Sequence, residues 1–421
     1  MEKLQAVRGM NDVLPADASK WEFFEDTVTR VARQYGYRNM RAPIVEYTPL
    51  FVRSIGEVTD IVEKEMYSFE DKLNGEKLTL RPELTAGLVR AAVEANLTYN
   101  GPVRIYTMGE VFRHERPQKG RYRQFNQFDV ECFGFDGPDV DAEIMVMTAR
   151  IWRELGINDV RLEINSLGNV DERAAYREKL IAHYEAQLPA LDDEAKRRLH
   201  TNPMRILDSK VASVIEVNKT APVLLDSLQD ESRAHFAKLQ QLLTEANVPF
   251  AVNPRIVRGM DYYNRTAFEF VTDRFGSPLT VCGGGRYDGL FEQLGGKPTP
   301  AIGFGMGIER VLMMLADSTP VATLDAYIVH AGDAAQKTAS SLAETLRDAG
   351  LAIAQHANGG SFKSQMKKAD ASGARYALVI GDNEVAAGTV AVKPLRDAQG
   401  AAIQGEQAII TSSAVAAHLR G

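Results

Sequence analysis

Residues 112–135 read FRHERPQKGRYRQFNQFDVECFGF, and this stretch decides the fold class. Its centre contains Pro117 and Gly120, and both residue types favour turns. Polar and apolar residues alternate after this turn, which is the pattern of a β-strand. Two further strands are predicted just before it, in VRIYTMG and EVFRHER. Strands that follow one another through short loops predict an antiparallel sheet.

The strand after the turn has two unlike faces, because successive side chains of a strand point in opposite directions. The first face could pack against helices, and the second could form the floor of a small-molecule pocket. A plain solvated face explains the second set equally well when the strand is taken alone. The first face consists of Asn126, Phe128, Val130 and Cys132, and the second of Phe125, Gln127, Asp129 and Glu131.

The tip of the hairpin is strongly basic. Five cations stand against the single acid Glu115, and they are Arg113, Arg116, Lys119, Arg121 and Arg123. A basic loop beside a carboxylate-lined strand suits a polyanion brought to a small-molecule pocket. The alternative is a solvated charged turn. The net charge of −7 argues against indiscriminate coating of nucleic acid, but it leaves local basic patches open.

The bulk composition is that of an ordinary globular protein. Of 421 residues, 45% are apolar and 25% are charged. The sequence has no run of eighteen apolar residues and no secretory signal at its start, so we expect a cytoplasmic protein without a membrane span. Cys132 and Cys282 have no partners at zinc spacing and cannot form a disulfide framework, so we expect buried thiols and no protein-held metal.

The sequence predicts two domains. Residues 1–322 would form an α+β domain built on the antiparallel sheet. Within it, residues of about 171–243 are charged and helical and indicate a helical insertion. Residues 323–421 alternate between apolar strands and helices, which predicts a C-terminal α/β domain of βαβ type with a mostly parallel sheet. Ser318-Thr319-Pro320 would be the linker.

A second polar segment precedes a predicted strand. Residues 257–271 read VRGMDYYNRTAFEFV, with a strand pattern only in the second half. Farther on, Gly283, Gly284 and Gly285 follow the predicted strand LTVC, and no Gly-Lys-Ser/Thr follows them as in a Walker loop. The glycines could let the backbone approach a ligand closely, or they could form a tight turn.

Several segments together resemble a known enzyme class. The hairpin of residues 112–123 resembles motif 2 of the class II aminoacyl-tRNA synthetases. Motif 1 is similar to residues 35–51, with Pro43 as its proline, and motif 3 to residues 301–315. TLRPELTAGLVRA, VRGMDYYNRTAFEFV and CGGGRYDGL are similar to segments of the histidyl-tRNA synthetases. Leu84 departs from the glycine that is frequent in that family at this position.

The resemblance implies a two-step reaction. L-Histidine would react with ATP, which carries Mg²⁺, to give histidyl-adenylate and pyrophosphate. The histidine would then pass to the 3′ end of histidine tRNA. Charge builds on phosphate oxygens in the first step, so it needs positioned cations more than a general base. Arginine suits this task because its planar fork pairs with phosphate oxygens.

The resemblance also implies the site residues. Arg113 and Arg258 would be catalytic and bind the α-phosphate, Arg310 would hold the γ-phosphate, and Phe125 would stack on adenine. The histidine-binding set would be Glu83, Thr85, Arg113, Gln127, Glu131, Arg258, Tyr262, Tyr263 and Tyr287. Of these, Glu83, Thr85 and Gln127 would engage the amino group, and Glu131, Tyr263 and Tyr287 would bind the imidazole. Arg116 and Gln118 would contact tRNA.

The resemblance implies partners as well. The C-terminal domain would bind the anticodon, and motif 1 would form a homodimer interface. The nearest alternative is a non-catalytic regulatory paralogue of the ATP phosphoribosyltransferase type, which typically lacks the C-terminal domain. Two others are a class II synthetase for another amino acid and a tRNA-binding pseudo-enzyme.

Overall fold

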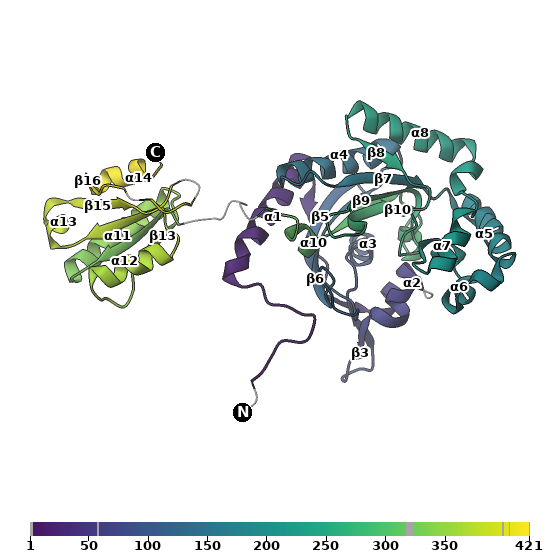
Figure 1. The fold of residues 1–421 in the computed structure, drawn as a ribbon, viewed down its shortest axis with the longest axis horizontal. Helices are drawn as coiled ribbons and strands as arrows, with labels where there is room; N and C mark the ends of the chain where they lie inside the picture. Colours follow the sequence, from purple (N-terminus) through teal and green to yellow (C-terminus); the bar gives the residue numbers. More distant parts are fainter. Residues whose placement is uncertain (1–2, 57–58, 317–323, 398–399, 404, 421) are drawn as a thin grey trace. The chain divides into compact units, whose positions relative to one another are not determined.

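The computed structural model describes residues 3–56, 59–316, 324–397, 400–403 and 405–420. The chain divides into two compact units, Met1–Asp317 and Ser318–Gly421 (Figure 1). The predicted linker at Ser318-Thr319-Pro320 and the predicted boundary after residue 322 lie outside the described residues. Among the helices that the structure describes, none is long and apolar enough to cross a membrane.

The first unit is built on an eight-stranded sheet with the order β1-β5-β6-β11-β10-β9-β7-β8. All pairs are antiparallel except the two edge pairs, β1 with β5 and β7 with β8. The predicted antiparallel sheet is therefore confirmed. The strands are β1 (Arg38–Asn39), β5 (Val103–Phe112), β6 (Gln124–Phe133), β7 (Arg161–Ser166), β8 (Phe250–Val252), β9 (Asn264–Thr272), β10 (Leu279–Arg286) and β11 (Ala301–Gly307).

The two strands predicted before the hairpin are one. VRIYTMG and the first three residues of EVFRHER form the single strand β5, which pairs with β6 from Val103↔Phe133 to Phe112↔Gln124. Gly109 does not interrupt β5 because it lies opposite Gln127 in a continuous ladder. The sheet places the Arg81 guanidinium where a Cβ at position 109 would stand. The prediction of two strands was wrong because a glycine inside a strand signals a close approach as well as a turn.

The two faces of β6 have different neighbours. Phe128, Val130 and Cys132 are fully buried in the main core, with residues from four helices. The opposite face turns toward a smaller cluster that includes Phe125, α3 (Thr85–Glu94) and α9 (Leu290–Gln293). The period-two prediction of an apolar and a polar face is thus confirmed. The four helices of the main core are α1 (Pro15–Gln34), α4 (Pro138–Glu154), α8 (Asp230–Glu245) and α10 (Ile308–Leu312).

The helical insertion lies between β7 and β8 and has a core of its own. Buried residues of this core include Tyr176, Leu180, Tyr184 and Val214. Figure 1 shows α5, α6 and α7 grouped beside the sheet, whereas α8 packs against α4 and contributes Leu239 to the main core. The helical elements are α5 (Val170–Glu185), η2 (Leu188–Ala190), α6 (Asp193–Arg198), η3 (Pro203–Asp208), α7 (Ala212–Lys219) and η4 (Leu224–Ser227).

A small three-stranded sheet begins within the motif 1 segment. Its order is β2-β4-β3, and every pair is antiparallel. Its elements, with the helices near it, are β2 (Val45–Tyr47), α2 (Thr48–Ile55), η1 (Ile61–Glu65), β3 (Tyr67–Glu70) and β4 (Lys77–Leu80). Large apolar side chains around it are exposed, and they are Ile44, Val45, Tyr47, Phe69 and Leu73.

The second unit is an α/β domain, as predicted, but its sheet is mixed. In the order β13-β12-β14-β15-β16, β12 is parallel to both of its neighbours and the other two pairs are antiparallel. The expectation of a mostly parallel sheet was wrong because the chain returns from β14 to β15 next to it, which allows an antiparallel pair. The strands are β12 (Ala326–His330), β13 (Ile353–Gln355), β14 (Tyr376–Ile380), β15 (Thr389–Pro394) and β16 (Ala408–Thr411). The helices are α11 (Asp333–Asp348), α12 (Phe362–Ala371), α13 (Asp382–Ala387) and α14 (Val415–Arg420).

Candidate active site

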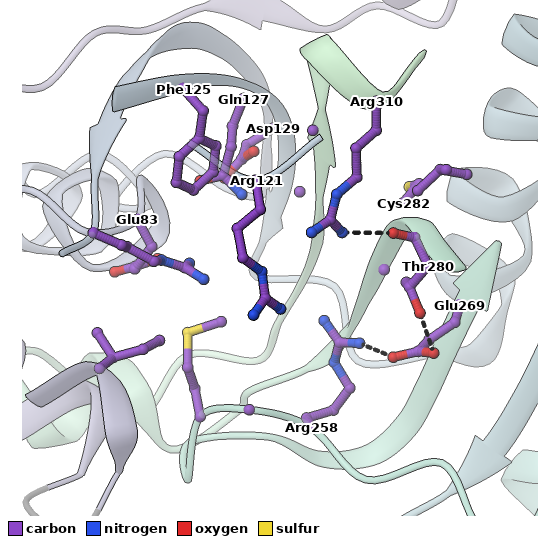
Figure 2. Close-up of a pocket in the computed structure, with 18 of the residues that line it drawn as sticks. Glu83, Arg121, Phe125, Gln127, Asp129, Arg258, Glu269, Thr280, Cys282 and Arg310 are labelled. Carbon is purple, nitrogen blue, oxygen red and sulfur yellow. Dashed lines mark hydrogen bonds and ion pairs between the residues drawn. The ribbon is translucent and has the colours of Figure 1, made fainter. Parts of the chain in front are cut away.

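A cavity of about 330 Å³ lies over the polar face of β6. Strands β6, β10 and β11 form part of its wall, together with the hairpin loop after β5 and the polar loop before β9 (Figure 2). Eight of the residues proposed from the sequence line it: Glu83, Thr85, Arg113, Phe125, Gln127, Arg258, Tyr263 and Arg310. Residues that are far apart in the chain therefore meet around one space.

Among the described residues, five arginines line the cavity, and Figure 2 labels three of them, Arg121, Arg258 and Arg310. The Arg310 guanidinium donates to the carbonyl of Thr280 at 2.9 Å and, through Nε, to the carbonyl of Gly120 at 3.0 Å. Burial, and then the neighbouring Arg121, lower the pKa of Arg310. Like charges held this close favour an anion between them.

The Arg258 guanidinium forms an ion pair with Glu269 on the cavity wall. Its Nη1 donates to Oε1 of Glu269 at 2.6 Å, and Oε2 of Glu269 accepts from the hydroxyl of Thr280 at 2.8 Å. The Arg258 guanidinium also lies 5.1 Å from the centre of the Tyr263 ring. These contacts aim a permanent cation into the cavity.

Arg113 and Phe125 form a second pair on the wall. The Arg113 guanidinium lies 5.5 Å from the centre of the Phe125 ring, and its Nε donates to the carbonyl of Pro82 at 2.8 Å. Phe125 is half-buried, and its ring lies toward the cavity in Figure 2. A partly open aromatic face beside a cation suits a flat base that carries phosphate.

Two buried carboxylates, those of Glu83 and Glu131, already have partners. Both oxygens of Glu83 accept backbone N–H groups at the start of α3, from Thr85 at 2.7 Å and from Ala86 at 2.8 Å. Both oxygens of Glu131 accept hydroxyls, from Thr85 at 2.6 Å and from Tyr287. Burial raises the pKa of Glu131 to about 8 and also raises the pKa of Glu83.

Three of the proposed histidine contacts lie behind the wall. Tyr262 and Tyr287 are buried, with ring centres 4.6 Å (Tyr262) and 6.3 Å (Tyr287) from that of Tyr263. Neither these two tyrosines nor Glu131 is among the described residues that line the cavity. Only Tyr263 of this cluster reaches the cavity, because the Tyr287 hydroxyl turns toward Glu131. Their role in binding imidazole stays a prediction.

The two proposed tRNA contacts lie at the hairpin tip. Arg116 and Gln118 are exposed, and neither is among the described residues that line the cavity. Gln118 exchanges two backbone hydrogen bonds with Arg121, of 3.0 and 2.9 Å, which close the turn. Backbone hydrogen bonds therefore fix the conformation of the tip, and the side chains of Arg116 and Gln118 are exposed.

The glycine run lies inside β10 and not after a strand. A Cβ at Gly284 would stand 2.0 Å from the carbonyl oxygen of Gly303, and one at Gly285 would stand 2.4 Å from that of Thr266. A Cβ at Gly283 would meet the Arg258 guanidinium at 2.8 Å. The interpretation as a tight turn was wrong, because these glycines make room for neighbouring strands and for Arg258.

The helical insertion holds the polar loop that carries Arg258. Arg205 of η3 donates to the carbonyl of Gly259 and itself lines the cavity. The amide of Asn202 donates to Asp261 at 3.0 Å, and Arg173 of α5 donates to the carbonyl of Tyr263. Asp261, which had no role from the sequence, is therefore an anchor between the loop and the insertion.

Asn264 and Arg265 also brace their surroundings. The Asn264 side chain exchanges hydrogen bonds with Asp288, at 3.1 Å to the carboxylate and 3.0 Å from the backbone N–H. Arg265 has a positive φ of 48° and pairs with Glu231 at 2.6 Å. The Asn264 contacts tie the start of β9 to the segment that carries Tyr287, and the Arg265 pair ties it to α8.

Sequence reasoning missed several residues that line the cavity. The period-two pattern placed Asp129 on the polar face of β6 with Gln127, but Asp129 was given no role in the site. Glu269 is the only acid in the apolar alternation of β9, which was a second usable signal. Arg205 had no such signal, because it comes from the insertion and reaches the site only through the fold.

Comparison with known proteins agrees with the motifs. The family model described as Histidyl-tRNA synthetase matches residues 9–311, and the model described as Anticodon binding domain matches residues 325–409. The histidine–tRNA ligase of Paraburkholderia phytofirmans is 58% identical over 414 residues, which cover 97% of this chain and 93% of that protein. That of Nitrosomonas europaea is 58% identical over 400 residues, covering 94% and 95%.

Solved structures agree as well. The apo S. aureus histidyl-tRNA synthetase superposes with a TM-score of 0.80 at 35% identity, covering 100% of both chains. An ATP phosphoribosyltransferase regulatory subunit/histidyl-tRNA synthetase from Bacillus halodurans has a TM-score of 0.64 at 22% identity, covering 87% of this chain and 97% of that one, and shares the fold. The resemblance drawn from the motifs is thus confirmed, and the chain belongs to the histidyl-tRNA synthetase family.

Proposed function

We propose that this chain is a histidine–tRNA ligase. It activates L-histidine with ATP to give histidyl-adenylate and pyrophosphate, and it then transfers the histidine to the 3′ end of histidine tRNA. The observation that carries the proposal is the division of one cavity into a cationic and an acidic end. Arg258 and Arg310 line the first, and Glu83 and Gln127 line the second.

The cationic end suits the phosphates of ATP. Arg113 and Arg258 would bind the α-phosphate, where negative charge grows as the histidine carboxylate attacks and pyrophosphate leaves. Arg310 would hold the γ-phosphate, and Phe125 would stack on the adenine. Preorganised cations of this kind stabilise a transition state without a reorganisation cost. Mg²⁺ enters as part of the ATP substrate.

The acidic end suits histidine. Glu83, Thr85 and Gln127 would receive the amino group. Tyr263 would contact the imidazole from the wall, with Glu131, Tyr262 and Tyr287 behind it. A pocket that hydrogen-bonds both ring nitrogens rejects amino acids without them, because its buried polar groups would otherwise be left unpaired.

The exposed hairpin tip would contact tRNA through Arg116 and Gln118. Residues 1–322 would form the catalytic domain and residues 323–421 the anticodon-binding domain. The match of the anticodon-binding model to residues 325–409 supports this division. Because the reaction belongs to translation, we place the protein in the cytoplasm.

A homodimer would form through the motif 1 region. The exposed apolar side chains Ile44, Val45, Tyr47 and Phe69 support this interface, because exposed apolar surface of this kind often marks an association site. Size-exclusion chromatography with light scattering tests it, and a clean monomer at micromolar concentration would refute it.

ATP–pyrophosphate exchange with each of the twenty amino acids tests the main proposal. Histidine alone should drive the exchange, and charging should then require histidine tRNA. Exchange with another amino acid would indicate a different specificity. No exchange with any of them would favour the regulatory paralogue, which needs no cationic end.

A further inference from the structure

Two buried acceptor oxygens on the floor of the cavity have no hydrogen-bond partner in the part of the chain that the structure describes. The Asp129 side chain lines the cavity and is only 2% exposed. Its Oδ1 accepts no hydrogen bond from any residue that the structure describes, and the same holds for Oε1 of Gln127. Native proteins leave few buried polar atoms unpaired, and such atoms call for a specific explanation.

The neighbouring carboxylates do not share this condition. Each oxygen of Glu83 and of Glu131 accepts a hydrogen bond within the chain. Gln127 and Asp129 are thus the two side chains on this floor with a buried oxygen that accepts no hydrogen bond from the described residues. They lie two residues apart on one face of β6, as Figure 2 shows.

The adjacent strand leaves room for both groups. Gly305 of β11 pairs with Asp129 in the sheet and also lines the cavity. A Cβ at this glycine would stand 2.9 Å from Nε2 of Gln127 and 3.0 Å from Oδ1 of Asp129. The ends of the two side chains therefore approach the same small volume, which a larger residue at position 305 would fill.

Two carboxyl groups, those of Glu83 and Asp129, line this end of the cavity, and a third, that of Glu131, lies behind its wall. Burial, and then the nearby Glu131 and Glu83, raise the pKa of Asp129 well above its ordinary value, whereas Arg113 and Arg81 oppose the shift. Such a site favours a bound cation, because a cation relieves the mutual repulsion of the carboxylates.

We propose that Asp129 binds the α-ammonium group of the amino-acid substrate, together with Gln127. An ammonium brings three donors and no acceptor, which matches acceptor oxygens that lack a donor. The inference rests on the proposed function and adds a residue to its substrate contacts. Asp129 would supply the negative charge that faces the ammonium group. Glu83 contributes less to this contact, because both of its oxygens already accept backbone hydrogen bonds.

Asp129→Asn tests the charge, because asparagine keeps the shape and loses the negative charge. The histidine KM in pyrophosphate exchange should rise about ten- to hundredfold, as expected for loss of a charged hydrogen bond. The ATP KM should change less than about twofold. Asp129→Ser gives a second, smaller neutral variant in case the first folds poorly, and a melting curve of each establishes folding.

Two histidine analogues separate binding from structure. Histidinol keeps the ammonium group and the imidazole, whereas imidazolepropionate lacks the ammonium group. Asp129→Asn should weaken inhibition by histidinol about as much as it weakens histidine, and it should leave inhibition by imidazolepropionate unchanged or stronger. A structural effect of the substitution would weaken both analogues alike.

Glu172→Gln is the matched control, because Glu172 is also a buried acid but hydrogen-bonds within the insertion, to Gln229 and Ser232. It should leave the ratio of the two inhibition constants unchanged. An unchanged ratio in folded Asp129→Asn would overturn the inference. If the wild-type protein showed no histidine-dependent exchange, the proposed function would fail instead.

Discussion

Arg258 and Glu269 form an ion pair on the wall of the cavity, with Nη1 and Oε1 2.6 Å apart. The two residues lie eleven positions apart, one on the loop before β9 and one inside β9. Glu269 is further fixed by the Thr280 hydroxyl of the neighbouring strand. The pair therefore holds the cation in place before any phosphate arrives, which reduces the cost of organising the site when ATP binds.

Replacing Arg258 by alanine should slow ATP–pyrophosphate exchange by about a hundred- to a thousandfold, because a preorganised charge at the α-phosphate is lost. Histidine binding, measured by calorimetry, should change only modestly. Arg265→Ala is the matched control, since Arg265 lies in the same segment but pairs with Glu231, outside the cavity. Exchange near the wild-type rate in Arg258→Ala would sink the assignment.

Replacing Arg205 by methionine should lower kcat/KM for exchange about two- to tenfold, because the loop with Arg258 loses a hydrogen bond at Gly259. Arg255 gives a matched control, since it also donates to two backbone carbonyls, those of Ala221 and Pro222, and is not among the described cavity residues. Arg255→Met should lower the melting temperature without a comparable loss of activity. Equal losses of activity in both variants would mean that the insertion acts only through stability.

Gly284→Ala should destabilise the first unit by about 3 kcal/mol, because its Cβ would stand 2.0 Å from a backbone oxygen that cannot move alone. Gly289→Ala is the control, since a Cβ at this position would have no described atom within 4 Å and the backbone φ is −86°. That change should stay within about 1 kcal/mol. Chemical denaturation measures both, and similar values for the two would contradict the packing argument.

Glu131→Gln should change the pH dependence of stability. Burial raises the pKa of Glu131 from 4.5 to about 8, so the folded protein holds a proton there that the unfolded chain loses above pH 4.5. The stability of the wild type should therefore fall as pH rises from about 4.5 to 8, by on the order of a few kcal/mol from this group. Glutamine cannot titrate, and Thr85 and Tyr287 can each still hydrogen-bond to it.

The variant should show a smaller loss of stability over that range, measured by denaturation at several pH values. Glu172→Gln should change the pH dependence of stability in the opposite direction. Burial raises the pKa of Glu172, but hydrogen bonds from Asn169 and Ser232 outweigh this effect and leave the pKa lowered. The stability that the ionised Glu172 carboxylate contributes is therefore lost as pH falls, and Glu172→Gln should remove this loss. Identical profiles of stability against pH for Glu131→Gln and Glu172→Gln would contradict the directions given for both pKa shifts.

Local patterns predicted the parts of the fold that depend on neighbours in the chain. The alternation in β6 placed Phe128 in the core and Gln127 toward the cavity, because the direction of a strand side chain follows from its position alone. The glycines of β10 were misread, because the same residue serves a turn and a tight strand contact, and only the opposite strand decides between them.

The sequence by itself determined the family, the antiparallel sheet of the first unit, the α/β class of the second and eight of the residues that line the cavity. The tertiary structure decided which oxygens are left free. Glu83 and Glu131 are already hydrogen-bonded, while Oδ1 of Asp129 has no partner among the described residues. It also decided that Arg205 reaches the cavity from the insertion. Hydrogen-bond partners come from segments far apart in the chain, so no local pattern of residues can reveal which of them are taken.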